Sequence, residues 1–242
     1  MTTQFPENLL SLYEGEEGLR QKALALVVAN KRLQLHLSVM EAAMDLADTL
    51  RQAPNEDEDF KVIKLMGMRM FNALAASLKL ALSGYGQNSA LIMRDILETV
   101  FLVDFFGHDR AAVTRWRLAD RKGRMKVFSP IRIREALDTR DGNIKKKRAE
   151  KYEMFSELAA HPTMQSAEMM RPVKGGNAVI GPFVEPTSFD AVLSELGWLA
   201  VEVGVVLGVF APPDFNKSQG VMLRFANIKG MWLLEFYPKP AG

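Results

Sequence analysis

Apolar residues recur every four and then every three positions through residues 18–50, and this spacing constrains the fold more than any other feature of the sequence. One face of an α-helix repeats at that interval, so we expect a long helix here. The series has one polar member, Asn30, and a single buried asparagine can fix the register of a coiled coil. Val27, Ala29 and Ala43 flank the series, so the apolar face is wider than a two-helix seam. The spacing therefore favours a long N-terminal helix within a multi-helix bundle.

Further helical segments follow along the rest of the chain, and we predict an all-α, single-domain fold for residues 1–242. Glycine or proline ends several of them, for example at Gly84 and before Pro130. The segment 87–106 is apolar nearly all round, which places it at the centre of the bundle. The helices predicted after the first cover residues 60–83, 87–106, 110–127, 131–137, 144–160, 187–210 and 217–236.

An irregular insertion at residues 161–186 interrupts the helical pattern, because prolines and glycines are frequent there. Residues 173–174 and 178–180 flank two glycines, so the insertion contains either a small β-hairpin or a loop without strands. Thr187 and Asp190 then form the pattern of a capping box, which predicts the start of the next helix.

Residues 189–210 are long and apolar enough to require a test as a membrane span. The segment also contains two glycines in a G-x-x-x-G spacing, which is typical of membrane helix dimers. Asp190, Glu195 and Glu202 argue against a span, because a carboxylate near the bilayer centre costs roughly 2.5–3.5 kcal/mol. We therefore expect a buried helix of a soluble protein and no membrane partner.

Cysteine is absent, and only His36, His108 and His161 could supply imidazole ligands, so we expect no disulfide framework and no metal site. The sequence contains no phosphate-binding loop, dinucleotide-binding fingerprint, serine nucleophile elbow or zinc-protease motif. We therefore expect no cofactor. The first ten residues lack the basic start and apolar stretch of a secretory signal, which favours a cytoplasmic location.

Arg94 and Glu98 lie four residues apart on one face of the apolar segment 87–106. Burying either charge without a partner is very costly, so we expect the two side chains to pair or to meet a third group. Two interpretations stay open: a catalytic polar pocket in the bundle core, or a buried salt bridge that fixes helix register. His161 ends a predicted helix just before Pro162, and it is either a third catalytic candidate or a structural histidine.

The basic region, residues 110–151, contains 15 Lys and Arg against five acids, a net charge of +10, whereas the rest of the chain carries −8. A concentrated positive field attracts polyanions. We predict that this region binds RNA, DNA or another polyanion, and the alternative is a solvated helix surface. The candidate phosphate-binding residues are Arg110, Arg117, Arg121, Arg124, Lys145, Lys146, Lys147 and Arg148.

Two short motifs carry a resemblance to known proteins. They are R-x-x-x-E, at Arg94 and Glu98, and S-x-x-x-x-H-P, from Ser156 to Pro162. Over residues 60–162 the chain resembles uncharacterised bacterial helical proteins that are distantly similar to HEPN-type bundles, including AbiV-like phage-defence proteins. The resemblance implies a helical fold, a homodimer, a polar site that includes His161, and a link to phage defence or mobile elements. HEPN ribonucleases typically carry R-x(4–6)-H, and this chain departs from that motif.

These observations lead to three function hypotheses. The first is a nucleic-acid-associated protein that uses the basic region. The second is an enzyme in which Arg94 holds an anionic substrate group while Glu98 or His161 acts as general base. The third is a helical interaction protein whose first helix is the partner surface.

Overall fold

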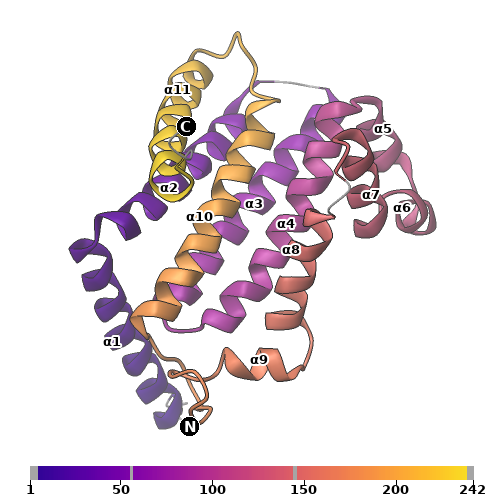
Figure 1. Cartoon of the computed structure of the whole chain (residues 1–242). Coiled ribbons are helices and arrows are strands. Elements are labelled where there is room, and N and C mark those ends of the chain that lie inside the picture. The colour runs from indigo at the N-terminus through magenta and orange to yellow at the C-terminus, as the bar shows by residue number, and fades with distance from the viewer. Residues whose placement is uncertain (1–4, 55–56, 144–145, 239–242) are drawn as a thin grey trace.

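The computed structural model of the chain describes residues 5–54, 57–143 and 146–238. No strand occurs in these ranges, which confirms the predicted all-α fold (Figure 1). The helices are α1 (Glu7–Ala29), α2 (Lys31–Gln52), α3 (Glu58–Leu82), α4 (Gly86–His108), α5 (Ala111–Leu118), α6 (Arg121–Val127), α7 (Pro130–Arg140), α8 (Lys147–Phe155), the π-helix η1 (Ser156–Ala160), α9 (Met164–Glu168), α10 (Pro186–Gly208) and α11 (Asn216–Phe236).

The core lies where α10 packs against α2, α3 and α4 (Figure 1). Its inward side chains are aliphatic and fully buried, among them Leu193, Leu196 and Leu199. Helix α4 contacts α5, α7 and α8 as well as α3 and α10, so it is central, as its apolar composition predicts. By length and hydropathy alone, α3 and α10 could each cross a membrane. Core helices pass the same test, and both helices pack against neighbours in the bundle.

The N-terminal helix breaks at Asn30, so the prediction of one continuous helix over residues 18–50 is wrong. Asn30 has an extended backbone, with φ −128° and ψ 110°. Its side-chain oxygen accepts a hydrogen bond of 2.9 Å from the backbone N–H of Arg32. Asparagine favours this capping position because it satisfies a backbone donor at the helix start. Asn30 therefore separates α1 from α2 and does not fix the register of a buried seam.

The predicted helix over residues 110–127 is also divided in two, for the same physical reason. The carboxylate of Asp120 accepts a hydrogen bond of 2.6 Å from the backbone N–H of Gly123, which caps α6. Arg110 precedes α5, while Arg121 begins α6. The basic residues of this segment therefore do not form one continuous helical stripe.

The insertion at residues 161–186 contains the short helix α9 and is otherwise a loop, so of the two predicted alternatives the hairpin does not form. The backbone N–H of Phe183 donates a hydrogen bond of 3.1 Å to the oxygen of Gly84, in the turn between α3 and α4. Gly84 has a φ of +86°, and a Cβ there would lie 2.8 Å from the Phe183 nitrogen. Glycine therefore allows the insertion to pack closely on this turn.

The N-cap of α10 lies two residues before Thr187, the N-cap of the predicted capping box. Pro186 is its first residue, and the carboxylate of Glu185 accepts hydrogen bonds from the backbone N–H groups of Thr187 and Ser188 at 3.1 and 2.8 Å. Thr187 is therefore inside the helix. Glu185 is the N-cap because proline suits the position that follows a cap.

Two glycines of α10 admit aromatic side chains from neighbouring helices. A Cβ on Gly204 would lie 2.1 Å from the ring of Phe225 on α11. A Cβ on Gly197 would lie 2.6 Å from Nδ1 of His36 on α2. In contrast, the nearest atom to a Cβ on Gly208 is 4.0 Å away. Gly204, the first glycine of the G-x-x-x-G pair, thus serves packing between helices of the same chain.

Candidate functional site

Arg94 and Glu98 project from one face of α4 and form an ion pair. Nη2 of Arg94 lies 3.4 Å from Oε1 of Glu98, and the two side chains are 27% and 31% exposed. The two side chains therefore pair, but they are partly exposed, so the interpretation as a buried salt bridge in the bundle core does not hold. The other faces of α4 pack on α3 and α10, whereas this face meets the shorter α7, α8 and η1, which cover it only in part.

Tyr152 of α8 lies against the same arginine. Arg94 donates a hydrogen bond to the phenol oxygen of Tyr152, and its guanidinium carbon lies 4.7 Å from the ring centroid. Arg134 of α7 places its guanidinium carbon 4.0 Å from the same centroid. Cations are attracted to the faces of aromatic rings. Two arginines thus share one tyrosine, and we call Arg94, Glu98, Arg134 and Tyr152 the arginine–tyrosine cluster.

Each arginine of the cluster has one buried nitrogen without a hydrogen-bond partner in the part of the chain that the structure describes. These atoms are Nε of Arg94 and Nη1 of Arg134. Buried donors in proteins are nearly always paired, so each of these N–H groups calls for an acceptor. Glu98 balances only one of the two positive charges. The cluster therefore offers unpaired donors and an excess of positive charge at one place.

Helix α8 continues directly into the π-helix Ser156–Ala160, which packs against α4. The Ser156 hydroxyl donates a hydrogen bond of 2.9 Å to the backbone oxygen of Tyr152. π-helical turns are rare in proteins and occur frequently at functional sites. This irregular turn adjoins the arginine–tyrosine cluster, and it lies in the segment of the S-x-x-x-x-H-P motif.

His161 follows the π-helix, but its side chain is exposed. Its backbone N–H donates a hydrogen bond of 3.0 Å to the oxygen of Ser156. Within the described ranges, no hydrogen bond or ion pair joins its imidazole to Arg94 or Glu98. The structure thus brings together two of the three predicted catalytic residues and leaves His161 apart. The sequence did not predict Arg134 or Tyr152 as site residues. The only sequence feature that points to Tyr152 is its position four residues before Ser156, the first residue of the S-x-x-x-x-H-P motif.

A cavity of about 380 Å³ adjoins the cluster. Glu98 and Asp95 of α4 line one side of it, and Trp116 and Phe128 from the α5–α6 segment line the other. Arg69 of α3 forms an ion pair with Asp95 at this cavity. The cluster therefore lies next to a space that the basic region helps to enclose.

Several cations of the basic region are paired with acids of the same molecule. Nε of Arg117 lies 2.8 Å from Oδ1 of Asp59 on α3. Arg148 forms ion pairs with Asp138 and Asp141. Asp138 and Asp141 are among the five acids already counted in the net charge of +10, whereas Asp59 lies outside residues 110–151 and neutralises a further cation. The positive field is therefore weaker than the net charge of the segment indicates.

Two further residues that the sequence predicts to bind phosphate pack against aromatic rings. The guanidinium carbon of Arg110 lies 3.8 Å from the ring centroid of Phe210, and burial lowers the pKa of this arginine from its ordinary value. The guanidinium carbon of Arg124 lies 5.7 Å from the ring centroid of Trp116. Both side chains therefore lie along the protein surface, which limits their reach toward a phosphate.

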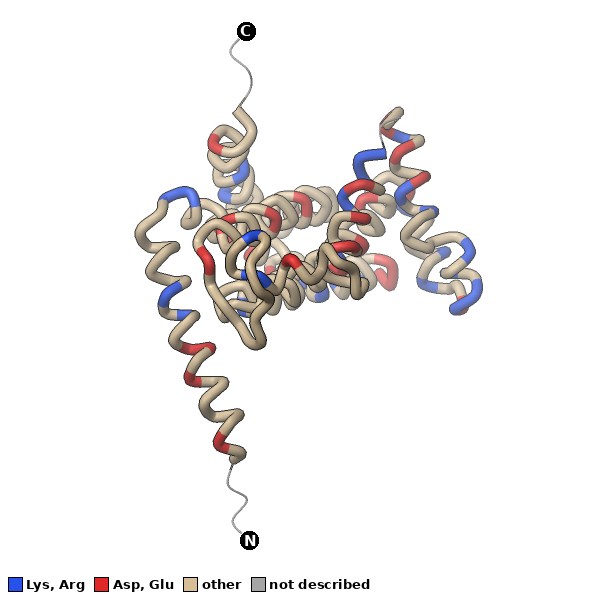
Figure 2. Tube along the Cα trace, turned by 60° about the horizontal axis from the view of Figure 1, so that its bottom comes forward, with Lys and Arg blue, Asp and Glu red and all other residues tan. Residues whose placement is uncertain are grey.

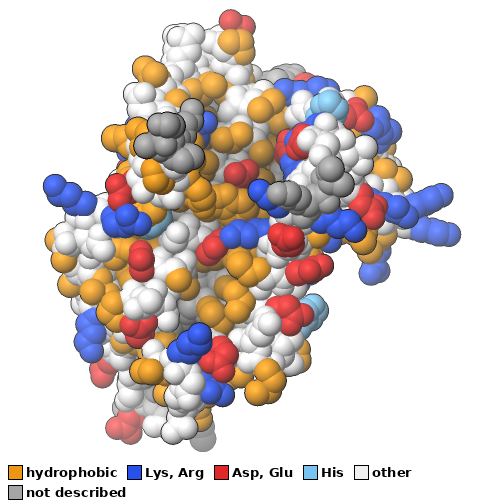
Figure 3. Space-filling model, viewed as in Figure 1, with side chains coloured by type: hydrophobic (Ala, Val, Ile, Leu, Met, Phe, Trp, Pro, Cys, Tyr) orange, Lys and Arg blue, Asp and Glu red, His pale blue; other side chains and the backbone are white. Residues whose placement is uncertain are grey.

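The cations that stay unpaired gather on α6 and at the start of α8. Figure 2 shows basic positions on the segment that projects on the right, and in Figure 3 basic side chains extend beyond the outline on that side. Lys145 lies outside the described residues. In the described ranges, the exposed cations of the basic region that have neither an ion pair nor a contact with an aromatic ring are Arg121, Lys122, Lys126, Lys146 and Lys147.

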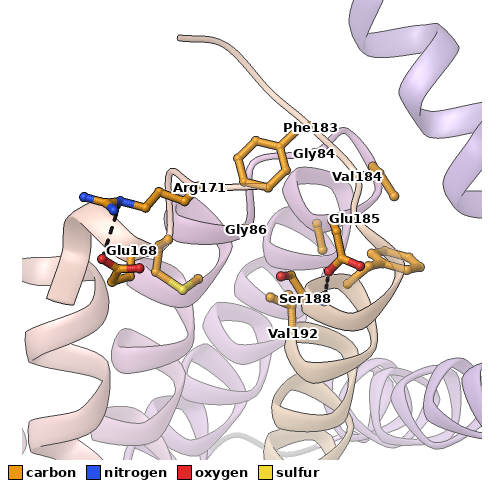
Figure 4. A pocket seen from close by; sticks show the side chains of 12 residues that line it. Gly84, Gly86, Glu168, Arg171, Phe183, Val184, Glu185, Ser188 and Val192 are labelled. Atoms are coloured by element: carbon orange, nitrogen blue, oxygen red, sulfur yellow. Dashed lines mark hydrogen bonds and ion pairs between the residues drawn. The ribbon is translucent and has the colours of Figure 1, made fainter. Parts of the chain in front are cut away.

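A small pocket lies where the insertion meets the α3–α4 turn (Figure 4). Its volume is about 70 Å³, and Gly84, Phe183 and Val192 are among its walls. Arg171 and Glu168 form an ion pair of 3.4 Å at one edge. The pocket contains none of the residues that the sequence predicts for a site, and it lies between the insertion and the helices α3, α4 and α10.

Within the described ranges, no three His, Asp or Glu side chains are grouped closely enough to hold a metal ion. The donors of the arginine–tyrosine cluster are mostly cationic, and guanidinium groups do not coordinate metals. The cluster is therefore suited to an anion.

Comparisons with known proteins assign the chain to no family. No family model matches it, and neither a curated protein nor a solved structure matches it. The resemblance to HEPN-type and AbiV-like bundles stays a prediction, as do the cytoplasmic location and the link to phage defence.

Proposed function

We propose that this protein binds the phosphate or carboxylate group of a small molecule between Arg94 and Arg134. One observation carries the proposal: both guanidiniums flank Tyr152, and each has a buried nitrogen without an acceptor in the described chain. Guanidinium groups bind oxyanions through directed, charge-assisted hydrogen bonds. One oxyanion offers enough acceptor sites to satisfy both donors.

The enzyme hypothesis is a second candidate, because Glu98 also lines the adjoining 380 Å³ cavity. In this version, a bound anion is held by Arg94 and Arg134, and the Glu98 carboxylate accepts a proton from a ligand group in the cavity. A general base must lie within hydrogen-bond reach of the proton that it removes. His161 is exposed and apart from the cluster, so we assign the role of base to Glu98 alone.

Inorganic phosphate is a direct probe of the proposed site. We expect phosphate at constant ionic strength to raise the melting temperature of the wild-type protein, because a ligand that binds only the folded state stabilises it. Arg94→Met and Arg134→Met should each abolish this rise. Arg134→Lys should retain part of it, since the charge stays while the second donor is lost.

Arg132→Met is the matched control, because Arg132 is on α7 two residues before Arg134 and pairs with Glu135 at the surface. It should respond to phosphate like the wild-type protein. Equal phosphate shifts in the Arg132, Arg94 and Arg134 variants would show that the anion acts elsewhere and would contradict the proposal. The same titration with acetate compares a carboxylate with a phosphate.

Nucleic-acid binding is a further proposal, and it is supported by the exposed, unpaired cations of α6. Arg121, Lys122 and Lys126 lie within this seven-residue helix. Phosphate contacts by such residues make affinity depend on salt but not on base sequence. Binding by these three residues alone would be weaker than binding by the continuous stripe that the sequence predicts.

A further inference from the structure

The N-terminal part of α1 extends beyond the bundle. Figures 1 and 2 show α1 running away from the body of the molecule toward the N-terminus. Only Ala23 and Val27 of α1 are buried, and both are near its C-terminal end. We call residues 5–19 the acidic arm, because they contain four glutamates and no basic residue. The arm is thus a helical surface with a net charge of −4.

The acidic arm also exposes apolar side chains. Leu9, Leu12 and Tyr13 are 43%, 37% and 53% exposed, and their spacing places them on the same side of α1 as the buried Ala23 and Val27. This face contacts the bundle as far as Glu16, whose carboxylate accepts a hydrogen bond of 2.7 Å from the Tyr85 hydroxyl. Beyond Glu16 it continues outward with its apolar side chains exposed in the described part of the chain. Exposed apolar faces of this kind mark interaction surfaces in soluble proteins.

The arm lacks features that would stabilise a helix by itself. Gly15 and Gly18 have no atom within 4 Å of the position that a Cβ would take. Glycine inside a helix costs roughly 0.5–1 kcal/mol relative to alanine. Short helices are marginal in water unless an apolar face is packed. Contact with a partner would supply the packing that this half of α1 lacks.

A surface of opposite charge lies at the α5–α6 end of the molecule. We call residues 118–131 the basic tip, because they contain four cations and one acid, a net charge of +3. The tip exposes four aliphatic side chains among its cations: Leu118, Met125, Val127 and Ile131, which are 71%, 65%, 51% and 55% exposed. It offers little to nucleic-acid bases, because its one aromatic residue, Phe128, is half-buried against Phe105 and Phe106.

The acidic arm and the basic tip match in both charge and apolar character, yet they lie on opposite sides of the molecule in Figures 1 and 2. Within one chain they do not meet. We propose that the acidic arm of one copy of this protein docks on the basic tip of a second copy. Leu9, Leu12 and Tyr13 would pack on the aliphatic side chains of the tip. Glu7 and Glu14 lie on the opposite side of α1, so they would attract Lys122 and Lys126 through the net charge of the arm and not through direct ion pairs.

A charge-swap experiment tests this pairing. Glu7→Lys with Glu14→Lys reverses charges on the arm, and Lys122→Glu with Lys126→Glu reverses them on the tip. We expect the full-length wild-type chain to show a mass of at least twice 27.1 kDa in light scattering after size exclusion. Each swapped variant alone should be monomeric, because the arm then has no net charge in the first variant and the tip has a net charge of −1, facing an arm of −4, in the second. An equal mixture of the two variants should associate again, because the unchanged arm of the tip variant (−4) can dock on the unchanged tip of the arm variant (+3).

The control is Lys31→Glu with Lys79→Glu, which changes the net charge as the tip variant does but at exposed positions outside both surfaces. It should associate like the wild-type chain, and circular dichroism should show that every variant is folded. Three results would each overturn the proposal: a monomeric wild-type chain, association of the single-surface variants at wild-type strength, or folded variants whose mixture stays monomeric. A monomeric chain that binds RNA or DNA through Lys122 and Lys126 would assign the tip to nucleic acid instead.

Discussion

The indole N–H of Trp232 donates a hydrogen bond of 2.9 Å to Nδ1 of His36, which joins α11 to α2 inside the protein. His36 is fully buried, and its ring also stacks on Phe236 with 4.2 Å between ring centroids. Because an indole nitrogen can only donate, Nδ1 must be unprotonated in this contact. The fold therefore requires the neutral form of His36.

We predict that the protein loses stability as pH falls from about 6.5 to about 4. Burial lowers the pKa of His36 to about 4, with Asp190 opposing the shift and Arg32 adding to it. The unfolded chain has an ordinary histidine pKa, so it binds the proton first. Above pH 6.5 the free energy of unfolding contains the full contribution of neutral His36. As the pH falls to about 4, the free energy of unfolding decreases by roughly 3 kcal/mol.

Urea unfolding at several pH values measures this effect. The variant His36→Gln keeps an acceptor for Trp232 but has no titrating group, so its stability should change less over the same window. An NMR titration in which the His36 ring signals shift near pH 6.5 would contradict the prediction.

Gly204→Ala and Gly208→Ala should have opposite effects, although the two glycines are four residues apart on α10. A new methyl group at residue 204 meets the ring of Phe225, and such overpacking typically costs about 1–3 kcal/mol. At residue 208 the methyl group finds space, so alanine should be neutral or stabilise by up to about 1 kcal/mol. Thermal melts of both variants check this, and equal losses would argue against close packing at Gly204.

Arg94 and Glu98 should be only weakly coupled in stability. Both side chains are partly exposed, and their closest approach is 3.4 Å. Pairs of this kind on helices contribute about 0.3–0.5 kcal/mol, compared with several kcal/mol for a fully buried pair. A double-mutant cycle of Arg94→Met and Glu98→Gln, measured by chemical unfolding, gives the coupling directly. A coupling above about 2 kcal/mol would mean that the pair is sealed from solvent.

Nucleic-acid binding through α6 has a characteristic salt dependence. Each phosphate contact on duplex DNA contributes about −0.9 to the slope of log affinity against log salt, so three contacts predict a slope of about −2.7. Fluorescence anisotropy with labelled DNA and RNA measures the slope. Replacing Arg121, Lys122 and Lys126 with glutamine should weaken binding to all sequences alike, whereas glutamine at Lys31 and Lys79 should not. A slope unchanged by the triple replacement would exclude α6 as the contact surface.

The helices were largely predictable from the sequence, because their apolar periodicity reflects which face is buried. The breaks at Asn30 and Asp120 were not, although both residue types favour helix caps. A polar residue within a periodic segment can face solvent or cap a new helix, and only the path of the chain decides which. The sequence therefore predicts long helices more readily than the points where they divide.

The candidate site was predictable in part. The pairing of Arg94 with Glu98 follows from their spacing on one helix. The contact of Arg94 with Tyr152 joins residues 58 positions apart, and so does the ion pair of Arg117 with Asp59. Neither contact is encoded by local spacing, because each depends on how separate helices approach in the bundle. For the same reason, the charge count of the basic region did not reveal which cations stay unpaired.

Because the chain breaks its helix at Asn30, a small change in the backbone there reorients the whole of α1. Its 23 residues span about 35 Å at 1.5 Å per residue. The direction of the whole helix depends on the backbone angles of this one residue, on the packing of Ala23 and Val27, and on the hydrogen bond between Glu16 and Tyr85. A rotation of only about 10° there would move the far end by about 6 Å. A substitution at Asn30 could therefore misalign Glu7 with whatever it contacts, without altering a single residue of the contact surface.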